Sequence, residues 1–181
     1  MRNNIVIMDR DGVINKDSGD YIRSAAEWTP IKGSIEALVL LKESGKRVFV
    51  ATNQSGIGRG LFDERELEAI HKKMIRTVEK AGGQIEGVVH CPHQPSDFCE
   101  CRKPRLGLLR QIEQLADQSV LGCPFVGDSL RDIEAAEAAG CEPVLVLTGN
   151  GLKTKPLVRG KVEIFNNLSE FAEHLVARHL N

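Results

Sequence analysis

Short apolar runs alternate with helix-like patterns along the chain, and this alternation constrains the fold more than any other feature of the sequence. Apolar runs of strand length occur at residues 5–8, 48–51, 87–90, 124–126 and 144–147, with a weaker run at 162–165. Helical periodicity occurs at residues 34–44, from Asp63 to Gly82, at 106–118, from Ser129 to Gly140, and from Ser169 to about His179. Alternating strands and helices predict an α/β protein, a three-layer α/β/α Rossmann-like parallel sheet with helices on both faces.

The composition is that of an ordinary globular protein. The 181 residues are 41% hydrophobic and 27% charged, with a net charge of -1. This balance gives no electrostatic case for binding nucleic acid or an anionic membrane. The sequence contains no interdomain linker, no signal-peptide core and no apolar run long enough to span a bilayer. We therefore expect one domain over residues 1–181 that is cytoplasmic and, because no apolar stripe demands a partner, monomeric.

Polar side chains follow three of the predicted strands at the point where each strand ends. The motifs are DRDG at residues 9–12, TNQSG at 52–56, and GDS at 127–129 with Asp132 one helical turn further on. Each motif alone is more readily explained as a turn or a helix cap. Together, at one edge of a parallel sheet, they bring several carboxylates close enough to repel one another unless a cation neutralises them. A hard, oxygen-ligated ion such as Mg²⁺ suits that role, and a phosphate commonly completes its coordination.

These three motifs and the lysine of CRKP, residues 101–104, occur in the order found in the haloacid dehalogenase superfamily of phosphohydrolases, which the chain resembles. The resemblance implies a sheet in which the first strand lies between the second and the fourth. It implies that Asp9 is the nucleophile, which forms an aspartyl phosphate, and that Asp11 is the general acid and base, protonated at first. Gly12 allows the sharp turn that brings Asp11 over the same phosphorus atom.

The resemblance also implies the remaining catalytic and metal-binding roles. Asp9, the Asp11 carbonyl group and Asp128 would hold Mg²⁺, with Asp132 behind them as an orienting residue. The Thr52 hydroxyl would bind phosphoryl oxygens, and Lys103 would balance the charge that builds up in the transition state.

Four candidate metal ligands lie within eleven residues. They form the pattern C-x-H, five residues, C-x-C, and are Cys91, His93, Cys99 and Cys101. This set suits a tetrahedral Zn²⁺, although free thiols beside a chance histidine would be the alternative and iron could occupy the same thiolates. Four protein ligands leave no open position, so we expect a structural zinc in a loop over residues 91–102. Arg102 and Lys103 follow at once, so this loop would fix both cations over the site. His90 lies outside the spacing.

The zinc loop narrows the resemblance to a branch with heptose bisphosphate phosphatases and histidinol-phosphate phosphatases. DRDGVIN, Asp17…Asp20-Tyr21 and TNQSGIGRG are more similar to the heptose enzymes. This implies removal of the 7-phosphate from heptose 1,7-bisphosphate, on the route to the nucleotide-activated heptose of lipopolysaccharide. Histidinol phosphate remains the nearest alternative substrate, and a non-enzymatic zinc module is the alternative of a different class.

A sugar with two phosphates suggests further substrate contacts. Arg102 suits the second phosphate; Arg59 is a weaker candidate that could equally be a solvated loop arginine. The other predicted substrate contacts are Asp17, Gly19, Asp20, Asn53, Gln54 and Ser55.

The spacing of the motifs leaves little room for a second domain. Only 42 residues lie between Asp9 and Thr52, and one helix with its connections accounts for them. We therefore expect no separate cap domain, and an open site partly roofed by residues 15–32, 53–62 and 91–102. Residues 153–161 are predicted to form a surface loop.

Overall fold

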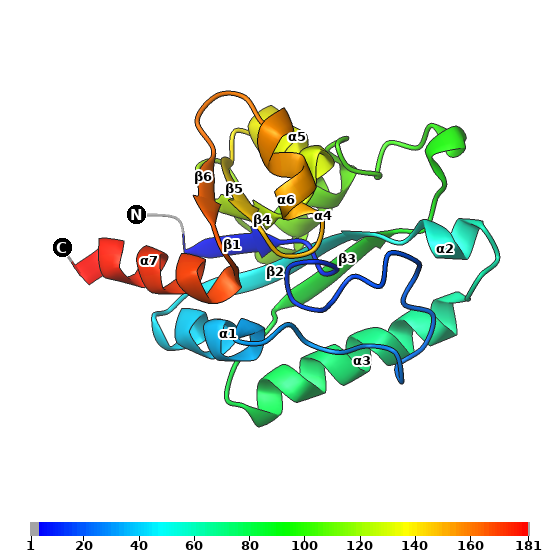
Figure 1. Cartoon of the computed structure of the whole chain (residues 1–181), viewed down its shortest axis with the longest axis horizontal. Helices are drawn as coiled ribbons and strands as arrows, with labels where there is room; N and C mark the ends of the chain where they lie inside the picture. The colour runs from blue at the N-terminus through cyan, green and yellow to red at the C-terminus, as the bar shows by residue number, and fades with distance from the viewer. Residues whose placement is uncertain (1–3, 181) are drawn as a thin grey trace.

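The computed structural model describes residues 4–180, without the side chains of residues 179 and 180. Within these residues, six parallel strands form one sheet in the order β3-β2-β1-β4-β5-β6 (Figure 1). The strands are β1 (Ile5–Met8), β2 (Arg47–Asn53), β3 (Gly87–Cys91), β4 (Pro124–Gly127), β5 (Glu142–Val146) and β6 (Glu163–Phe165). The predicted place of the first strand between the second and the fourth is confirmed.

Helices cover both faces of the sheet, which confirms the three-layer prediction (Figure 1). The α-helices are α1 (Ser34–Glu43), α2 (Ser55–Gly58), α3 (Glu64–Lys80), α4 (Gly107–Ala116), α5 (Leu130–Ala138), α6 (Gly151–Thr154) and α7 (Leu168–Leu180). Two single turns of 3₁₀ helix, η1 and η2, cover Pro95–Asp97 and Lys155–Leu157.

The buried central strand β1 shows how the two faces are divided. Val6 and Met8 pack into the core beneath α1, α3 and α7, whereas Ile5 and Ile7 pack into the core beneath α4 and α5. All four side chains are at most 1% exposed, because a strand covered on both faces has no solvent side. Burial at this depth leaves the residue after Met8 at the carboxyl edge of a rigid strand.

A local sequence signal explains where the longest of the described helices, α3, begins. At the start of α3, the Glu66 backbone N–H donates to Asp63 Oδ1 (2.9 Å), and the Asp63 N–H donates to Glu66 Oε2 (2.8 Å). This capping box satisfies two N–H groups that the helix itself leaves unpaired. The helix then buries Leu67, Ile70, Met74 and Val78, the apolar face that the sequence predicts.

The predicted elements are confirmed to within a few residues at their ends, but the predicted loop at 153–161 is wrong over its first half. Residues 153–157 are helical, in α6 and η2. The buried Thr154 hydroxyl donates to the Asp128 carbonyl oxygen (2.8 Å) and ties this turn to the end of β4. A single tertiary hydrogen bond of this kind leaves no periodic signal in the sequence.

The segment between β1 and α1, residues 9–33, consists of turns, bends and irregular backbone. Among its described residues, pairing is limited to isolated bridges that join Asn15 to Asp11 and to Pro30. None of the helices in the described part of the chain is long and apolar enough to cross a bilayer.

Candidate active site

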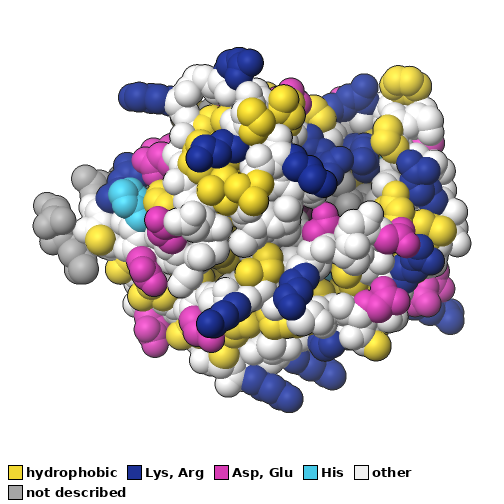
Figure 2. All heavy atoms as spheres, in the orientation of Figure 1, with side chains coloured by type: hydrophobic (Ala, Val, Ile, Leu, Met, Phe, Trp, Pro, Cys, Tyr) yellow, Lys and Arg dark blue, Asp and Glu magenta, His cyan; other side chains and the backbone are white. Residues whose placement is uncertain are grey.

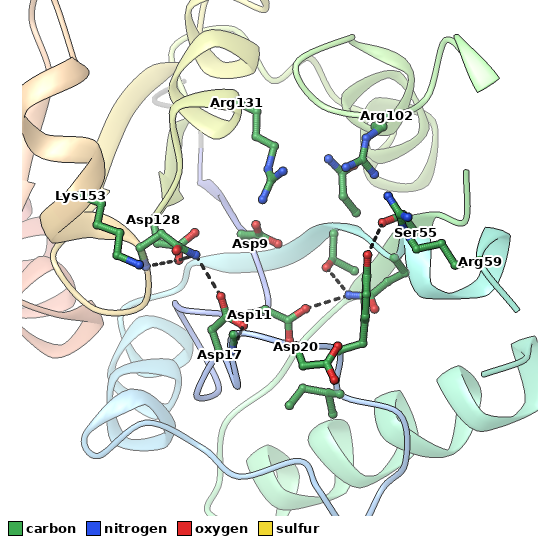
Figure 3. Close-up of a pocket in the computed structure, with 17 residues that line it drawn as sticks. Asp9, Asp11, Asp17, Asp20, Ser55, Arg59, Arg102, Asp128, Arg131 and Lys153 are labelled. Carbon is green, nitrogen blue, oxygen red and sulfur yellow. Dashed lines mark hydrogen bonds between the residues drawn. The ribbon is translucent and has the colours of Figure 1, made fainter. Parts of the chain in front are cut away.

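A pocket of about 410 Å³ opens at the carboxyl ends of β1, β2 and β4 (Figure 3). Most of the predicted site residues line it, and they come from segments far apart in the sequence. The lining residues are Asp9, Asp11, Asp17, Gly19, Asp20, Tyr21, Ile22, Thr52, Asn53, Gln54, Ser55, Arg59, Arg102, Asp128, Arg131, Asn150 and Lys153. Two predicted residues, Lys103 and Asp132, are fully buried and lie behind Asp9.

The Lys103 ammonium group is held by three oxygen atoms. Nζ lies 2.9 Å from Asp9 Oδ2 and 2.7 Å from Asp132 Oδ1, and it donates to the Ala51 carbonyl oxygen at 2.7 Å. Burial disfavours the charge, but Asp132 and Asp9 outweigh burial and raise the pKa of Lys103. These contacts use the three N–H donors of an ammonium group. Lys103 therefore contacts the Asp9 carboxylate in this arrangement, and its predicted role of balancing the transition-state charge stays a prediction.

Asp9, Asp128 and Asp132 each offer a carboxylate oxygen within 4.8 Å of the others. Burial, Asp132 and Asp128 raise the pKa of Asp9 from 3.8 to about 7, although Lys103 opposes them. Burial and Asp132 raise the pKa of Asp128 to about 6. Carboxylates crowded in this way need a cation, and their hard oxygen donors fit Mg²⁺.

The other contacts of Asp132 favour the outer role predicted for it. While Oδ1 faces Lys103, Oδ2 accepts from the Ser129 backbone N–H (3.0 Å) and from its hydroxyl group. Lys103 holds the pKa of Asp132 below its usual range against the effect of burial. With both oxygens engaged, Asp132 orients Lys103 and caps α5. Of the three clustered carboxylates, Asp9 and Asp128 are the two that line the pocket.

Asp128 is held in place by the loop that follows β5. The backbone N–H of Asn150 donates to Asp128 Oδ2 (2.7 Å), and its side-chain amide donates to the same oxygen (3.2 Å). Gly12 lies against this oxygen with a φ of 78°, and a Cβ atom added there would be 2.0 Å from it. Sequence reasoning missed Asn150, which lies beyond β5 but is separated from the strand end by residues 147–149.

The Asp11 carboxylate is surrounded by hydrogen-bond donors. It accepts from the Arg10 guanidinium group (2.9–3.1 Å), from the Asn15 amide (2.9 Å) and from the Gln54 amide (2.9 Å). Burial raises the pKa of Asp11, but Arg10 and these amides outweigh burial and hold the pKa below its usual range. This environment favours the ionised form of Asp11 in the absence of substrate, and the expectation that Asp11 enters the reaction protonated stays a prediction.

Two residues of the TNQSG motif support other side chains. Both ends of the Asn53 amide bind the Lys103 backbone, as Nδ2 donates to its carbonyl oxygen (3.2 Å) and Oδ1 accepts from its N–H (3.1 Å). The Gln54 amide donates to Asp11 and also to Thr52 Oγ1 (2.8 Å). The predicted substrate contacts of Asn53 and Gln54 would therefore come in addition to these supporting roles.

Basic side chains line the rim of the pocket above these carboxylates. They are Arg59, Arg102, Arg131 and Lys153, and Figure 2 shows such side chains along the upper rim of a hollow on this face. Burial and the nearby charge of Arg131 lower the pKa of Arg102, so these cations repel one another until an anion lies between them. In Figure 3, Arg131 points across the pocket toward Asp9. We had not predicted Arg131 or Lys153; Arg131 follows the GDS motif by two residues, which could have identified it.

The remaining predicted contacts lie on the opposite wall. Asp17 accepts from the Asn150 side-chain amide (2.9 Å), and Asp20 pairs with Arg23. Tyr21, which we had not predicted, places its hydroxyl 3.4 Å from Ser55 Oγ. This wall offers carboxylates and hydroxyls rather than cations.

The four predicted zinc ligands come together in one cluster. The Cys101 sulfur lies 3.2 Å from Cys91 Sγ, 3.6 Å from Cys99 Sγ and 3.2 Å from His93 Nδ1. A tetrahedral site with Zn–S bonds of about 2.3 Å requires sulfur atoms about 3.8 Å apart, close to these separations. The donor set therefore fits zinc. His90 stays outside the cluster, with Nε2 3.0 Å from Glu64 Oε2.

The zinc cluster is linked to the pocket through the residues that follow it. Arg102 Nη1 donates to the His93 carbonyl oxygen (3.2 Å), and the Lys103 backbone is held by Asn53 as described above. None of the five cysteines, which all lie in the described part of the chain, is joined in a disulfide. The cluster thus fixes the backbone that carries one rim cation and the buried lysine.

Comparisons with known proteins agree with this geometry. A HAD-hydrolase-like family model matches residues 100–171. The chain is 49% identical to the D-glycero-beta-D-manno-heptose-1,7-bisphosphate 7-phosphatase of Pseudomonas aeruginosa, over 97% of this chain and 99% of that protein. It is 46% identical to the protein of that name from Bordetella bronchiseptica, over 95% and 97% of the two chains.

A solved structure is also similar over nearly the full length. The crystal structure of D,D-heptose 1.7-bisphosphate phosphatase from B. bronchiseptica, complexed with magnesium and phosphate, matches with a TM-score of 0.93 and 44% identity. The match covers 97% of this chain and 99% of that chain. The chain therefore belongs to the D-glycero-beta-D-manno-heptose-1,7-bisphosphate 7-phosphatase family of the haloacid dehalogenase superfamily.

Proposed function

We propose that this protein is a magnesium-dependent phosphatase that removes the 7-phosphate from D-glycero-D-manno-heptose 1,7-bisphosphate. The observation that carries the proposal is the arrangement around Asp9, whose carboxylate lies between Lys103 and Asp128 at the floor of a pocket with a basic rim. The names of the relatives support the choice of substrate.

In the proposed reaction, Asp9 attacks the phosphorus atom in line with the leaving oxygen. The new bond joins an Asp9 oxygen to phosphorus, the bond from phosphorus to the sugar oxygen breaks, and an aspartyl phosphate results. Bound Mg²⁺ would supply positive charge that offsets repulsion between the phosphate and the carboxylate. Lys103 favours the ionised form of Asp9 and fixes its orientation, because the ammonium group contacts Asp9 Oδ2 at 2.9 Å. Water then attacks the phosphorus atom and releases Asp9.

Asp11 transfers the protons in both steps. It donates a proton to the departing sugar oxygen and then takes one from the attacking water. Because its pKa lies below the usual range without substrate, we propose that the dianionic phosphate raises this pKa as it binds. Asp11 would then enter the reaction protonated, as expected for the family.

The rim of the pocket suits the second phosphate. Arg102, Arg131 and Lys153, with Arg59 at the edge, would bind the phosphate that is not hydrolysed. Asp17, Asp20 and the backbone at Gly19 would bond the sugar hydroxyls, with Ser55 on the adjacent wall. Thr52 would hold a phosphoryl oxygen beside Asp9.

One observation favours a second candidate, histidinol phosphate. Asp17 and Asp20 are carboxylates on the pocket wall, and they could pair with the ammonium group of that substrate. Histidinol phosphate, however, carries only one phosphate, which would lie beside Asp9. The four rim cations would then have no anionic partner, whereas the second phosphate of the bisphosphate would supply one. The deciding experiment is phosphate release from both anomers of heptose 1,7-bisphosphate and from histidinol phosphate, each with Mg²⁺ and with a chelator. Higher kcat/KM for histidinol phosphate would overturn our choice.

The remaining predictions concern the setting of the enzyme. The cysteine-rich zinc set requires reduced thiols, which supports a cytoplasmic location. The product would supply the synthesis of nucleotide-activated heptose for the lipopolysaccharide core. We propose a monomer that binds neither nucleic acid nor membranes, with a structural zinc at residues 91–102; gel filtration and metal analysis test this.

A further inference from the structure

Arg10 is a charged side chain in the middle of the DRDG motif, and it is 0% exposed. It is absent from the lining of the pocket, so it has no direct path to substrate. A buried guanidinium group is costly unless its charge is paired and its donors are satisfied. The partners of Arg10 therefore show which interactions offset the cost of burying its charge.

The guanidinium group has partners on two sides. Nε and Nη2 both donate to Asp11, Nη2 to each of its carboxylate oxygens, at 2.9–3.1 Å. Nη1 lies 3.2 Å from His71 Nε2. One side of this planar group thus forms hydrogen bonds with the Asp11 carboxylate, and the other side contacts His71, a half-buried residue of α3.

His71 is suited to accept the hydrogen bond from Arg10. Burial and the neighbouring Arg10 charge lower the pKa of His71 to about 3, so the ring is neutral. Because Arg10 can only donate, Nε2 must be the unprotonated nitrogen and Nδ1 must carry the proton. His71 is therefore a neutral hydrogen-bond acceptor for the Arg10 guanidinium group, in the tautomer that carries its proton on Nδ1.

We propose that Arg10 and His71 are positioning residues that fix the orientation of the Asp11 carboxylate for proton transfer. The inference rests on the proposed function, in which Asp11 first protonates the sugar oxygen and then activates water. Both steps need the carboxylate aimed at the same point above the phosphorus atom. A forked contact on both oxygens sets the plane of the carboxylate, and His71 stops the long arginine side chain from turning away.

This role predicts a specific kinetic signature. A sugar alkoxide is a poor leaving group and needs a proton from Asp11, whereas p-nitrophenolate leaves without one. The parameter kcat/KM covers the steps up to departure of the leaving group. Misorientation of Asp11 should therefore lower kcat/KM for the sugar phosphate much more than for p-nitrophenyl phosphate. A merely structural loss would lower both values equally.

The test compares two variants of nearly the same size at one position. His71→Met fills the space but removes the strong acceptor, and His71→Gln keeps an acceptor for Arg10. Both residues are good helix formers, so α3 should persist. We expect His71→Met to lower kcat/KM for heptose 1,7-bisphosphate roughly 10-fold, mainly through kcat, as a part of the factor of 10² to 10⁴ that general acid catalysis supplies. The value for p-nitrophenyl phosphate should fall less than about 3-fold, and His71→Gln should restore much of the loss.

His90→Ala is the matched control. The His90 ring packs edge-on against the His71 ring (6.0 Å between centroids) and pairs with Glu64, so it lies in the same region of the surface. This variant should leave the ratio of the two kcat/KM values unchanged. Arg10→Lys, which keeps the charge but loses the fork, should change the ratio as His71→Met does, and it replaces His71→Met if that variant does not fold.

Three results would overturn the inference. They are an equal loss for both substrates, no loss in His71→Met, and a change of the same size in His90→Ala. Wild-type enzyme that fails to hydrolyse heptose 1,7-bisphosphate but hydrolyses p-nitrophenyl phosphate would instead overturn the proposed substrate.

Discussion

Lys103 Nζ lies 2.9 Å from Asp9 Oδ2, and both side chains are buried at the end of β1. The same ammonium group touches Asp132 at 2.7 Å, so one cation separates two carboxylates. This relationship makes the orientation of Asp9, the proposed nucleophile, depend on a residue that does not line the pocket. It also links the end of β1 to the loop that carries the cysteine cluster, because Lys103 follows Cys101 by two residues.

Replacing Lys103 by Met should destabilise the protein as well as abolish activity. The change leaves two buried carboxylates with no cation between them, and breaking a buried ion pair in this way costs about 3–5 kcal/mol. Denaturant unfolding without Mg²⁺ measures the loss. Lys72→Met, which removes an exposed partner of Glu68, is the control and should leave stability nearly unchanged. An equally small effect at Lys103 would contradict the described geometry.

Gly12→Ala should weaken Mg²⁺ binding in addition to straining the backbone. The new Cβ would lie 2.0 Å from Asp128 Oδ2 and would push that carboxylate out of place. Gly45→Ala is the matched control, because it has a φ of 77° with no atom within 4 Å of the added Cβ. Both variants pay roughly 1–2 kcal/mol for a left-handed conformation. Only Gly12→Ala should raise the Mg²⁺ concentration needed for half-maximal activity, and equal Mg²⁺ dependence in both variants would count against the Asp128 site.

The stabilisation that Mg²⁺ provides should grow as the pH rises. The pKa values of Asp9 (about 7) and Asp128 (about 6) exceed the ordinary 3.8, so the folded protein binds more protons than the unfolded chain between about pH 4 and 7. Without metal, these two groups therefore destabilise the fold as the pH rises through this window. Mg²⁺ competes with the same protons and removes the repulsion at high pH.

The measurement is the difference in Tm with and without Mg²⁺ at pH 5 and at pH 8. We expect a small increase at pH 5 and a larger one at pH 8. In Asp128→Asn, which lacks one carboxylate, the difference should be smaller at both pH values. The same increase at pH 5 and pH 8 in the wild-type protein would show that protons and Mg²⁺ do not share this site.

Loss of zinc should reduce activity through the position of Lys103. In Cys99→Ser the cluster loses one of its four ligands, and the backbone at residues 101–103 loses its anchor. We expect less than one equivalent of zinc per chain, a lower Tm and a fall in kcat. Cys141→Ser replaces a buried cysteine outside the cluster and should keep the full zinc content. A zinc-free Cys99→Ser protein with wild-type Tm would contradict a structural role.

Much of this site could be predicted because strands and polar motifs are adjacent in the sequence. Asp9, Thr52 and Asp128 each follow a buried apolar run, and parallel strands bring such positions to one edge. The zinc ligands were predicted from spacing alone. Asn150 also lies beyond a strand, β5, but residues 147–149 separate it from the strand end, so no polar motif follows the apolar run directly.

The contacts that could not be predicted arise between segments that are distant in sequence. His71 is half-buried on α3, and no local pattern distinguishes a partner of Arg10 from any other histidine on a helix. Lys153 was placed in a loop because the tertiary hydrogen bond of Thr154 leaves no periodic signal. The low pKa of Asp11 likewise depends on Arg10 and Gln54 folding around it.

The most direct test of the central claim is to find the covalent intermediate. Asp11→Asn should form the aspartyl phosphate with a good leaving group and hydrolyse it slowly, because the base that activates water is gone. After acid quenching of this variant with p-nitrophenyl phosphate and Mg²⁺, peptide mass spectrometry should place one phosphoryl group on Asp9. In the double variant with Asp9→Asn, no peptide should carry the group. A phosphoryl group on another residue, or one that persists without Asp9, would contradict the account.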